Sequence, residues 1–372
     1  MPIRQNRGNC GVILLVILAL IIGGGFFLKS LVGSFSLPEE LKTPRVIVNE
    51  DMFARSGFLA DERLGKVSDI LIRPEAGDKA IAVAGTTGVL YADAAGRATS
   101  VTALKAQAAD VTFTDVENDG NLELISGGSW IVTASLFNAQ GELLWQYGKD
   151  SPGVNDITSG DVDGDGIKEF AIGFNGGTGV HLVDKNGQMI WKQDDGNVWH
   201  VEMLDTDGDG RSEVVHSNAG GELTLRDKDG KVISRKNPPD YFSGFSLCRW
   251  PSQTGKVHAI HARNGQAYVI DFDGEVAAQY PTPLAKKGQA EPKAVFVQLK
   301  KDQPEYLAVA MDFGHWDRAI LYIYNPNKEI VYQEVLPANA RALAVLKAAE
   351  SETQTLLIGG ENEVWQLRAL GN

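Results

Sequence analysis

Residues 161–174 read Asp-Val-Asp-Gly-Asp-Gly-Ile-Lys-Glu-Phe-Ala-Ile-Gly-Phe, an acidic, glycine-containing loop followed at once by an apolar strand of small residues. The same order of loop and strand begins at Asp115 in the preceding segment and at Asp205 in the following one. Asp and Gly favour tight turns, and a short apolar run between turn signals is typical of a buried β-strand. This repeated unit is the feature that predicts the fold.

The apolar strand recurs along the rest of the chain. Its copies begin at Ile81, Leu124, Phe170, Val214, Val257, Leu307 and Leu356, and successive starts are 43 to 50 residues apart. A second marker, a hairpin glycine, keeps the same phase at Gly96, Gly141, Gly187, Gly230 and Gly274. A period of about 40–50 residues is that of a four-stranded propeller blade, and Asp-Gly or Asn-Gly between apolar strands indicates a β-hairpin. We therefore predict an all-β, seven-bladed β-propeller; six or eight blades stay open, because the first and sixth copies are the least regular.

The last copy lacks a fourth strand. Residues 363–367 read as its third strand, and the sequence continues only to Asn372. Residues 45–48, Arg-Val-Ile-Val, form an unassigned strand before the first blade. Pairing this strand with the last blade would close the ring and remove its exposed edge. The predicted propeller therefore spans residues 44–372.

The N-terminal segment predicts a membrane anchor. Residues 12–28 form an uncharged apolar run long enough to span a bilayer as a helix. Arg4 and Arg7 precede the run, which places the N-terminus in the cytoplasm. The alternative is a cleaved signal peptide, but no A-x-A-like site follows the run. We expect a cytoplasmic segment at 1–11, a transmembrane signal anchor at 12–33, a linker at 34–43, and a periplasmic or extracellular propeller.

The three acidic loops have the spacing of a calcium site. Each has oxygen donors at positions 1, 3, 5 and 9, a backbone carbonyl available at position 7, and glycine at position 6. Calcium takes about six to eight oxygen ligands. The predicted ligands are Asp115, Glu117, Asp119, Asn121 and Glu123 in the first loop, Asp161, Asp163, Asp165, Ile167 and Glu169 in the second, and Asp205, Asp207, Asp209, Arg211 and Glu213 in the third. An EF-hand is disfavoured, because position 12 is Ser126, Ile172 or His216 instead of glutamate.

These loops also explain the charge of the protein. The net charge is −13, and the loops contribute twelve carboxylates. Proteins that bind nucleic acid show a basic face instead. The composition thus argues against nucleic-acid binding and links the acidity to bound cations.

The loop and strand pattern resembles the FG-GAP or VCBS-type repeat, the calcium-bearing propeller blade of integrin α-subunit heads and many bacterial surface proteins. The resemblance covers the repeats from about residue 44 onward and is strong only in the three acidic blades; the other blades depart from it. It implies three structural calcium ions that join the first and second strands of these blades. The Gly-x-x-x-Trp spacing of Trp145 and Trp191 is similar to that of quinoprotein-type propellers. We expect these two tryptophans to link neighbouring blades.

Strand order predicts which loops share a face of the propeller. The acidic loops and the hairpins emerge on one side, whereas the other connections emerge on the opposite side. The residues expected on that opposite face as ligand-binding candidates are Trp130, Trp199, His200, Tyr241, Phe242, His315 and Trp316. For each aromatic residue alone, packing in the core is the competing interpretation.

The function expected from these features is a membrane-anchored, extracytoplasmic module that binds a protein or a glycan. No Asp-His-Ser arrangement and no metal-ligand His pair is evident, so we do not expect an enzyme. Two alternatives remain open: a carbohydrate-active enzyme resembling polysaccharide lyases, which needs a base and cations in one cleft, and an envelope-assembly scaffold.

Overall fold

The computed structural model describes residues 37–106, 108–128, 133–238, 242–249, 257–285, 290–347 and 353–370. The chain divides into two compact units, Met1–Thr43 and Pro44–Asn372. In the first unit, the described residues include one short 3-10 helix, η1 (Glu39–Leu41). The anchor predicted at residues 12–33 lies outside the described residues. Within the described ranges, no helix has the length and apolar character needed to cross a membrane.

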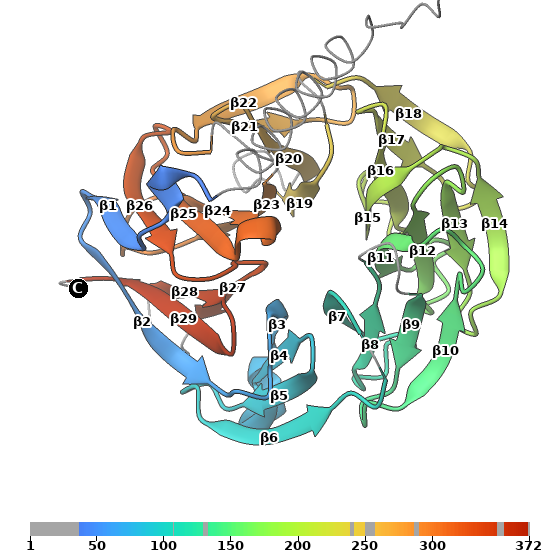
Figure 1. Ribbon diagram of the computed structural model, residues 1–372, viewed down its shortest axis with the longest axis horizontal. Coiled ribbons are helices and arrows are strands. Elements are labelled where there is room, and N and C mark those ends of the chain that lie inside the picture. Colours follow the sequence, from blue (N-terminus) through green and yellow to red (C-terminus); the bar gives the residue numbers. More distant parts are fainter. Residues whose placement is uncertain are drawn as a thin grey trace, which may run out of the picture. The chain divides into compact units, whose positions relative to one another are not determined.

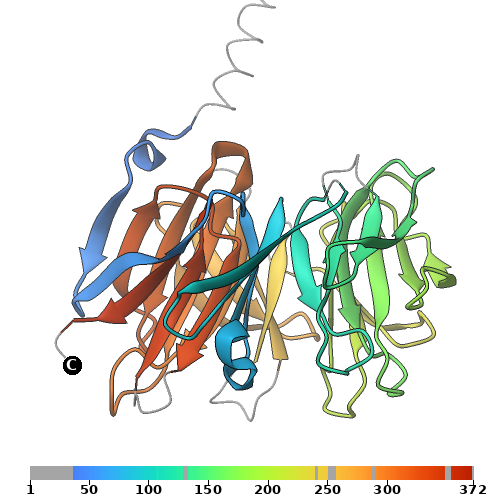
Figure 2. The ribbon, with the colours of Figure 1, turned by 90° about the horizontal axis from the view of Figure 1, so that it is seen from below.

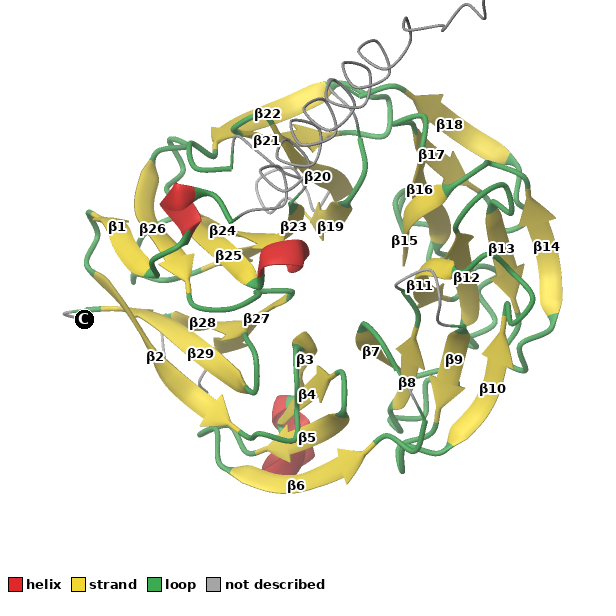
Figure 3. Cartoon of the chain, viewed as in Figure 1, coloured by secondary structure: helices red, strands yellow, loops and turns green. Residues whose placement is uncertain are grey.

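The second unit is a ring of seven antiparallel sheets (Figure 1), which confirms the predicted seven-bladed propeller. Seen from the edge, the strands of the blades run between the two faces of the ring (Figure 2). In the part of the chain that is described, helical structure is confined to short 3-10 turns (Figure 3), namely η1, η2 (Pro74–Lys79) and η4 (Gly314–Trp316).

Each blade begins with its innermost strand and ends at the rim. Blade 1 comprises β3 (Val67–Ile72), β4 (Ile81–Gly85), β5 (Gly88–Ala92) and β6 (Ala98–Ala103), and blade 2 comprises β7 (Val111–Thr114), β8 (Glu123–Ser126), β9 (Ala134–Phe137) and β10 (Leu143–Tyr147). Blade 3 comprises β11 (Val154–Gly160), β12 (Glu169–Phe174), β13 (Val180–Val183) and β14 (Met189–Gln193), and blade 4 comprises β15 (Val198–Leu204), β16 (Glu213–Asn218), β17 (Leu223–Arg226) and β18 (Val232–Lys236).

The remaining blades follow the same order until the chain returns to its N-terminal strands. Blade 5 comprises β19 (Phe245–Arg249), β20 (Val257–Arg263), β21 (Gln266–Ile270) and β22 (Val276–Pro281). Blade 6 comprises β23 (Glu291–Val297), β24 (Tyr306–Phe313), β25 (Arg318–Tyr324), β26 (Ile330–Leu336) and, as a fifth strand, β1 (Arg45–Asn49). Blade 7 comprises β27 (Ala342–Lys347), β28 (Gln354–Gly359), β29 (Glu363–Ala369) and β2 (Phe53–Ala60).

An N-terminal strand closes the ring, but it is a different strand from the one predicted. β2 pairs antiparallel with β29 from Phe53 to Ala60, whereas the predicted strand, β1, pairs with β26 of blade 6. β2 buries Phe53 and Leu59 in the core, while β1 is mostly exposed. The closing strand escaped prediction because its two buried residues stand far apart around Arg55 and Gly57 and form no continuous apolar run.

The core lies between adjacent blades, and the glycine that ends the repeated strand makes this packing possible. A Cβ on Gly127 would lie 2.8 Å from Ile157 of the next blade, and one on Gly173 would lie 2.8 Å from Val198. These distances are shorter than real Cβ contacts allow, so a larger residue would force the blades apart. In blades 2 and 3, the sequence marker is therefore a contact point for the following blade.

The hairpin glycines adopt the left-handed conformation, but their turns are not the two-residue type in which both central residues have positive φ. Gly187 and Gly230 have φ values of 75° and 76°, whereas Asn186 and Asp229 are not among the described residues with positive φ. The strand register shifts directly after these turns. This combination is a type I turn followed by a glycine bulge, in which only the glycine needs positive φ.

The outer-strand tryptophans link neighbouring blades, as expected. Trp145 Nε1 donates a hydrogen bond of 3.0 Å to the Lys185 carbonyl in the hairpin of the next blade. Trp191 Nε1 makes the same bond, at 2.9 Å, to Lys228. In blade 4, Ser234 Oγ donates to the Phe272 carbonyl at 2.6 Å. The serine therefore replaces the tryptophan in the same rim contact.

Candidate functional site

Two of the three acidic loops bring carboxylates close enough to hold one cation. The β11–β12 loop assembles Asp161, Asp163 and Glu169, and the β15–β16 loop assembles Asp205, Asp207 and Glu213, with ligand atoms within 4.8 Å of one another. Two oxygens bound to the same calcium ion at about 2.3–2.6 Å can be at most about 5 Å apart. The donor set and its spacing therefore fit a hard divalent cation.

Backbone amides hold these loops in shape. Asp161 accepts hydrogen bonds from Gly164 N at 2.7 Å and from Gly166 N at 2.9 Å. Glu169, at the start of β12, accepts one from Val162 N at 3.1 Å. Asp205 and Glu213 accept equivalent bonds in the next blade. The predicted fifth-position ligands Asp119, Asp165 and Asp209 instead accept hydrogen bonds from the seventh-position amides of Asn121, Ile167 and Arg211.

The first acidic loop does not assemble such a triad among the described residues. Glu117 stands where the other loops have Asp163 and Asp207, and its longer side chain pairs with Lys185 Nζ at 2.6 Å. Asp115 and Glu123 still accept hydrogen bonds from loop amides. The structure thus supports two of the three predicted cation sites.

The acidic loops carry an electrostatic cost that a cation would relieve. Burial and the neighbouring carboxylates of the loop raise the pKa of Glu169 to about 7. The pKa values of Glu123 and Glu213 are raised for the same reasons. A bound divalent cation would replace this repulsion by attraction.

Direct hydrogen bonds join the three loops from blade to blade. Lys168 N donates to the Val116 carbonyl at 2.9 Å, and Ser212 N donates to the Asp161 carbonyl at 2.7 Å. The guanidinium of Arg249, in blade 5, donates to the Asp205 carbonyl at 3.1 Å. A cation that orders one loop would therefore also stabilise the contacts of that loop with the next blade. The role of such a cation would be structural.

The opposite face of the ring contains a cavity of about 180 Å³ on the propeller axis. All seven blades contribute to it through their innermost strands or the residues just before them. These strands surround the centre of the ring (Figure 1). Its lining residues are Ser68, Asp110, Thr112, Asn155, Asp156, Ile157, Trp199, His200, Ser243, Gly244, Ala290, Glu291, Lys293 and Arg341. Convergent polar groups in a concave site are the usual sign of a binding site.

Two of the predicted ligand-face residues line this cavity, namely Trp199, which is 39% exposed, and His200. Phe242 is fully buried and stacks on Phe245 at 5.1 Å, so it belongs to the core. Trp316 stacks on Phe313 at 5.7 Å. Trp130 and Tyr241 lie outside the described residues, as does the side chain of His315.

His200 is the centre of a charged network along the inner strands. Its Nδ1 pairs with Asp156 of β11, and its Nε2 lies 3.3 Å from Glu202 Oε1. Burial alone would lower the pKa of His200, but Asp156 and Glu202 outweigh it and raise the pKa to about 10. His200 is therefore protonated at neutral pH and cannot act as a general base.

The other charged groups of the inner ring come from residues that the repeat analysis did not single out. Arg341, just before β27, pairs with Asp110 and with Asp312, whose carboxylate lies 3.0 Å from its Nε. Lys293 and Glu291 lie on β23. The cavity thus collects the cations His200, Lys293 and Arg341 in one place, a convergence that sequence alone did not specify.

One signal in the sequence could have indicated this inner ring. Blades 1 and 3 share a Val-[Ser/Asn]-Asp-Ile unit at Val67 and Val154. Asp69 accepts a hydrogen bond from Phe113 N of the next blade at 2.9 Å, and Asp156 accepts one from Val201 N at 3.0 Å. The repeated aspartate therefore attaches the inner strands of blades 1 and 3 to those of blades 2 and 4.

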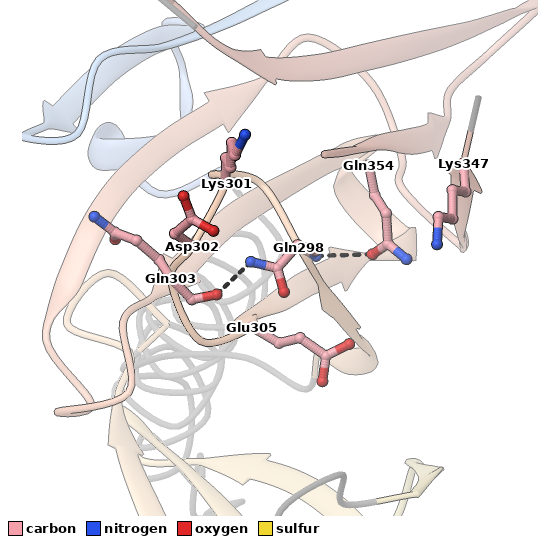
Figure 4. A pocket seen from close by; sticks show the side chains of 7 residues that line it. All are labelled: Gln298, Lys301, Asp302, Gln303, Glu305, Lys347 and Gln354. Atoms are coloured by element: carbon pink, nitrogen blue, oxygen red, sulfur yellow. Dashed lines mark hydrogen bonds between the residues drawn. The ribbon is translucent and has the colours of Figure 1, made fainter. Parts of the chain in front are cut away.

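A second hollow, of about 430 Å³, lies on the acidic-loop side, among the β23–β24 loop, Lys347 and Gln354 (Figure 4). Gln298 occupies it and bonds within the structure: its amide N donates to Gln354 Oε1 at 2.8 Å, and its Nε2 donates to the Lys300 carbonyl at 2.6 Å. The lining side chains are polar or charged throughout. The axial cavity is the better candidate for a binding site.

Solved structures with the same architecture include crystal structures of BBS1N in complex with ARL6DN, one soaked with lead and one with mercury. Each has a TM-score of 0.54 and 11% sequence identity, and the similarity covers 88% of this chain and 98% of that chain. At this identity the likeness shows the propeller fold alone. No protein-family model matches the chain, and no curated protein matches it.

Proposed function

We propose that this protein is an anchored, extracytoplasmic binding module whose propeller receives a partner protein on the face that contains the axial cavity. The observation that carries the proposal is the cavity itself, a concave site to which all seven blades contribute polar or charged groups, with a partly exposed tryptophan in its lining. Partly exposed aromatic residues are favoured anchors in protein interfaces. The similar propeller BBS1N was solved in complex with a protein, ARL6DN, which supports the same use of the fold.

The chemistry of the cavity favours binding over catalysis. His200 is protonated, Arg341 is held by Asp110 and Asp312, and carboxylates such as Glu202 raise the pKa of Lys293 despite its burial. No cation of the lining is thus available as a base at neutral pH. A volume of about 180 Å³ is also below the range of about 300–1,000 Å³ that is usual for ligand pockets, and a polysaccharide chain needs more. The charges and the volume of the cavity therefore disfavour a lyase-like reaction.

The acidic loops support a structural use of calcium within this module. We assign calcium to the Asp161 and Asp205 loops, in keeping with the FG-GAP or VCBS-type repeats that the sequence resembles. Calcium accepts the all-oxygen donor sets that these loops offer. The loops lie on the face opposite the cavity, so the ions would stiffen the scaffold without touching the partner.

Site-specific photo-crosslinking tests the proposed binding face. A photoreactive residue at position 199 of the full chain, in the cells that make the protein, should yield a discrete adduct with another protein. The same residue at position 229, in an exposed hairpin on the acidic-loop face, is the control. Adducts of equal yield from both positions, or none from position 199, would overturn the proposal.

The proposed anchor and its orientation have a separate test. In intact cells stripped of any outer barrier, added protease should digest the propeller, and the N-terminal segment should remain with the membrane fraction. A propeller that becomes accessible only after the membrane is permeabilised would contradict the extracytoplasmic location.

A further inference from the structure

Large apolar side chains are exposed at the start of three consecutive outer strands. They occupy the same two positions after the hairpin in β10, β14 and β18, namely Leu143 and Leu144, Met189 and Ile190, and Val232 and Ile233. These strands lie at the rim of the ring (Figure 1), and each is the last strand of its sheet, so that among the described residues no strand pairs with its outer edge. Exposed apolar groups on an open edge favour pairing with a further strand.

The second residue of each apolar pair lies at a bulge. The register of β14 against β13 shifts at Ile190, which pairs with no residue of β13 and is 50% exposed. Equivalent shifts in β10 and β18 leave Leu144 and Ile233 unpaired in the same way. β6 and β22 also have the shift, but their unpaired residues are Thr99 and Ala277. Blades 2 to 4 therefore differ from blades 1 and 5 in presenting a large apolar side chain at this position.

Blade 6 shows what covers the bulge position. The unpaired residue of β26 is Val331, and it is only 4% exposed. β1 pairs antiparallel with β26 as a fifth strand, and Glu50 N, just after β1, donates a hydrogen bond of 2.8 Å to the Val331 carbonyl. Every residue of β26 after Ile330 is buried, whereas β14 is largely exposed. The fold thus already contains one outer strand whose edge is covered by an added antiparallel strand.

The charges of the open edges indicate the chemistry of a partner strand. The charged residues of β10, β14 and β18 are Lys192, Arg235 and Lys236, so all of them are cations. Arg235 already pairs with Asp195 at 2.6 Å, whereas Lys192 of β14 is exposed two residues after Ile190. A lysine on an edge strand opposes pairing with a second copy of the same strand, because like charges would meet. A strand with a carboxylate opposite Lys192 gains attraction instead.

We propose that the open edge of β14 binds an extended, acidic segment of another protein as an added antiparallel strand, in the way that β1 adds to β26. Main-chain hydrogen bonds hold the segment, an apolar side chain packs on Ile190, and a carboxylate faces Lys192. The rim site goes beyond the partner-binding face around the axial cavity, since no residue of β14 lines that cavity.

Peptides derived from β1 are the probes. Residues 44–50, Pro-Arg-Val-Ile-Val-Asn-Glu, contain the strand that covers β26, and Val48 lies opposite Gln333. Gln333 has the place in β26 that Lys192 has in β14, two residues after the bulge. In fluorescence anisotropy with the full chain, the labelled Val48→Glu peptide should bind saturably, and the Val48→Lys peptide at least threefold more weakly. The Val48→Glu peptide with N-methylated amides at 46–48 should not bind, because it cannot donate ladder hydrogen bonds.

Three variants of the full chain locate the strand pairing. Ile190→Asp places a carboxylate against the acidic peptide and should weaken its binding at least threefold. Ala277→Asp makes the equivalent change at the exposed bulge of β22 and should bind the peptide like the wild type. Lys192→Glu should reverse the preference, so that the Val48→Lys peptide binds more tightly, a gain that an unfolded variant would not show. Because Ile190 is half exposed, the melting temperature of Ile190→Asp should stay close to that of the wild type.

Four results would overturn the proposal. The first is no saturable binding of the Val48→Glu peptide to the wild type. The second is equal binding of the N-methylated peptide, which would exclude strand pairing. The third is unchanged affinity in Ile190→Asp, which would place the peptide away from β14. The fourth is an unchanged preference in Lys192→Glu, which would remove the requirement for an acidic partner.

Discussion

Replacing His200 by leucine tests the charged network on the propeller axis. The substitution leaves the carboxylates of Asp156 and Glu202 without the cation between them. The pKa of His200 is raised from 6.5 to about 10, and this shift of about 3.5 units corresponds to about 5 kcal/mol at about 1.36 kcal/mol per unit. Breaking a buried ion pair by removing one partner costs about 3–5 kcal/mol. We expect His200→Leu to lose about 3–5 kcal/mol of unfolding free energy at pH 6.

The stabilisation that His200 contributes should decrease as the pH rises. Because the folded-state pKa of His200 is raised, its stabilisation is complete below 6.5 and is lost as the pH rises from 6.5 toward 10. Urea unfolding of the wild type and the variant should therefore show a gap that narrows over this range. Glu291 and Lys293 of β23 face the same network and are present in both proteins.

A second substitution separates the ion pair from simple packing. The double variant Asp156→Asn/His200→Leu removes a stranded charge as well as the histidine. It should be less destabilised than the sum of its single variants by at least about 1 kcal/mol, since the two residues interact directly. A His200→Leu loss below about 1 kcal/mol, or a gap that is independent of pH, would refute the assignment of a protonated histidine.

Three further predictions concern the scaffold. Calorimetry of protein first treated with chelator should show that millimolar calcium raises the melting temperature. Asp161→Asn/Asp205→Asn should abolish most of this rise, whereas Asp115→Asn should keep most of it, since the first loop assembles no triad among the described residues. A rise that survives the double variant would contradict the two sites. In urea unfolding, Leu59→Ala on the closing strand β2 should lower the free energy of unfolding by about 2–5 kcal/mol. Val46→Ala on β1 should lower it by less than about 0.5 kcal/mol, because Val46 is 49% exposed. The reverse order would mean that β1 closes the ring. Trp191→Phe keeps an aromatic ring but loses the hydrogen bond to the Lys228 carbonyl, so it should lower the free energy of unfolding by about 1 kcal/mol in the same assay. Unchanged stability would contradict a stabilising role for this rim contact.

The parts of the fold that repeat could be predicted from the sequence, and the parts that depend on ring closure could not. Gly127 and Gly173 recur with the blade period because each packs against the innermost strand of the next blade. The closing strand has no such signal, since Phe53 and Leu59 are the only residues it buries in the core. The expected blade count, the acidic loops and the tryptophan contacts all follow from the periodic signal.

The axial cavity shows the limit of sequence reasoning more clearly. Trp199 and His200 were predicted on the binding face from the order of the strands. Lys293 and Arg341 were not, because a single polar residue on or next to an inner strand does not stand out from the polar residues that alternate along the other strands. Residues of blades 3, 4, 6 and 7 meet only because the ring closes around its axis. Because these residues converge only in the closed ring, no local spacing in the sequence reveals the cavity.

Amide hydrogen exchange of the full chain, alone and in complex with the partner identified by crosslinking, tests the proposed binding face most directly. The proposal predicts new protection around the axial cavity, in residues 110–112, 198–202 and 291–293, with little change in the acidic loops at 161–169 and 205–213. Protection confined to the acidic loops would show that the partner binds the opposite face and would contradict the central claim.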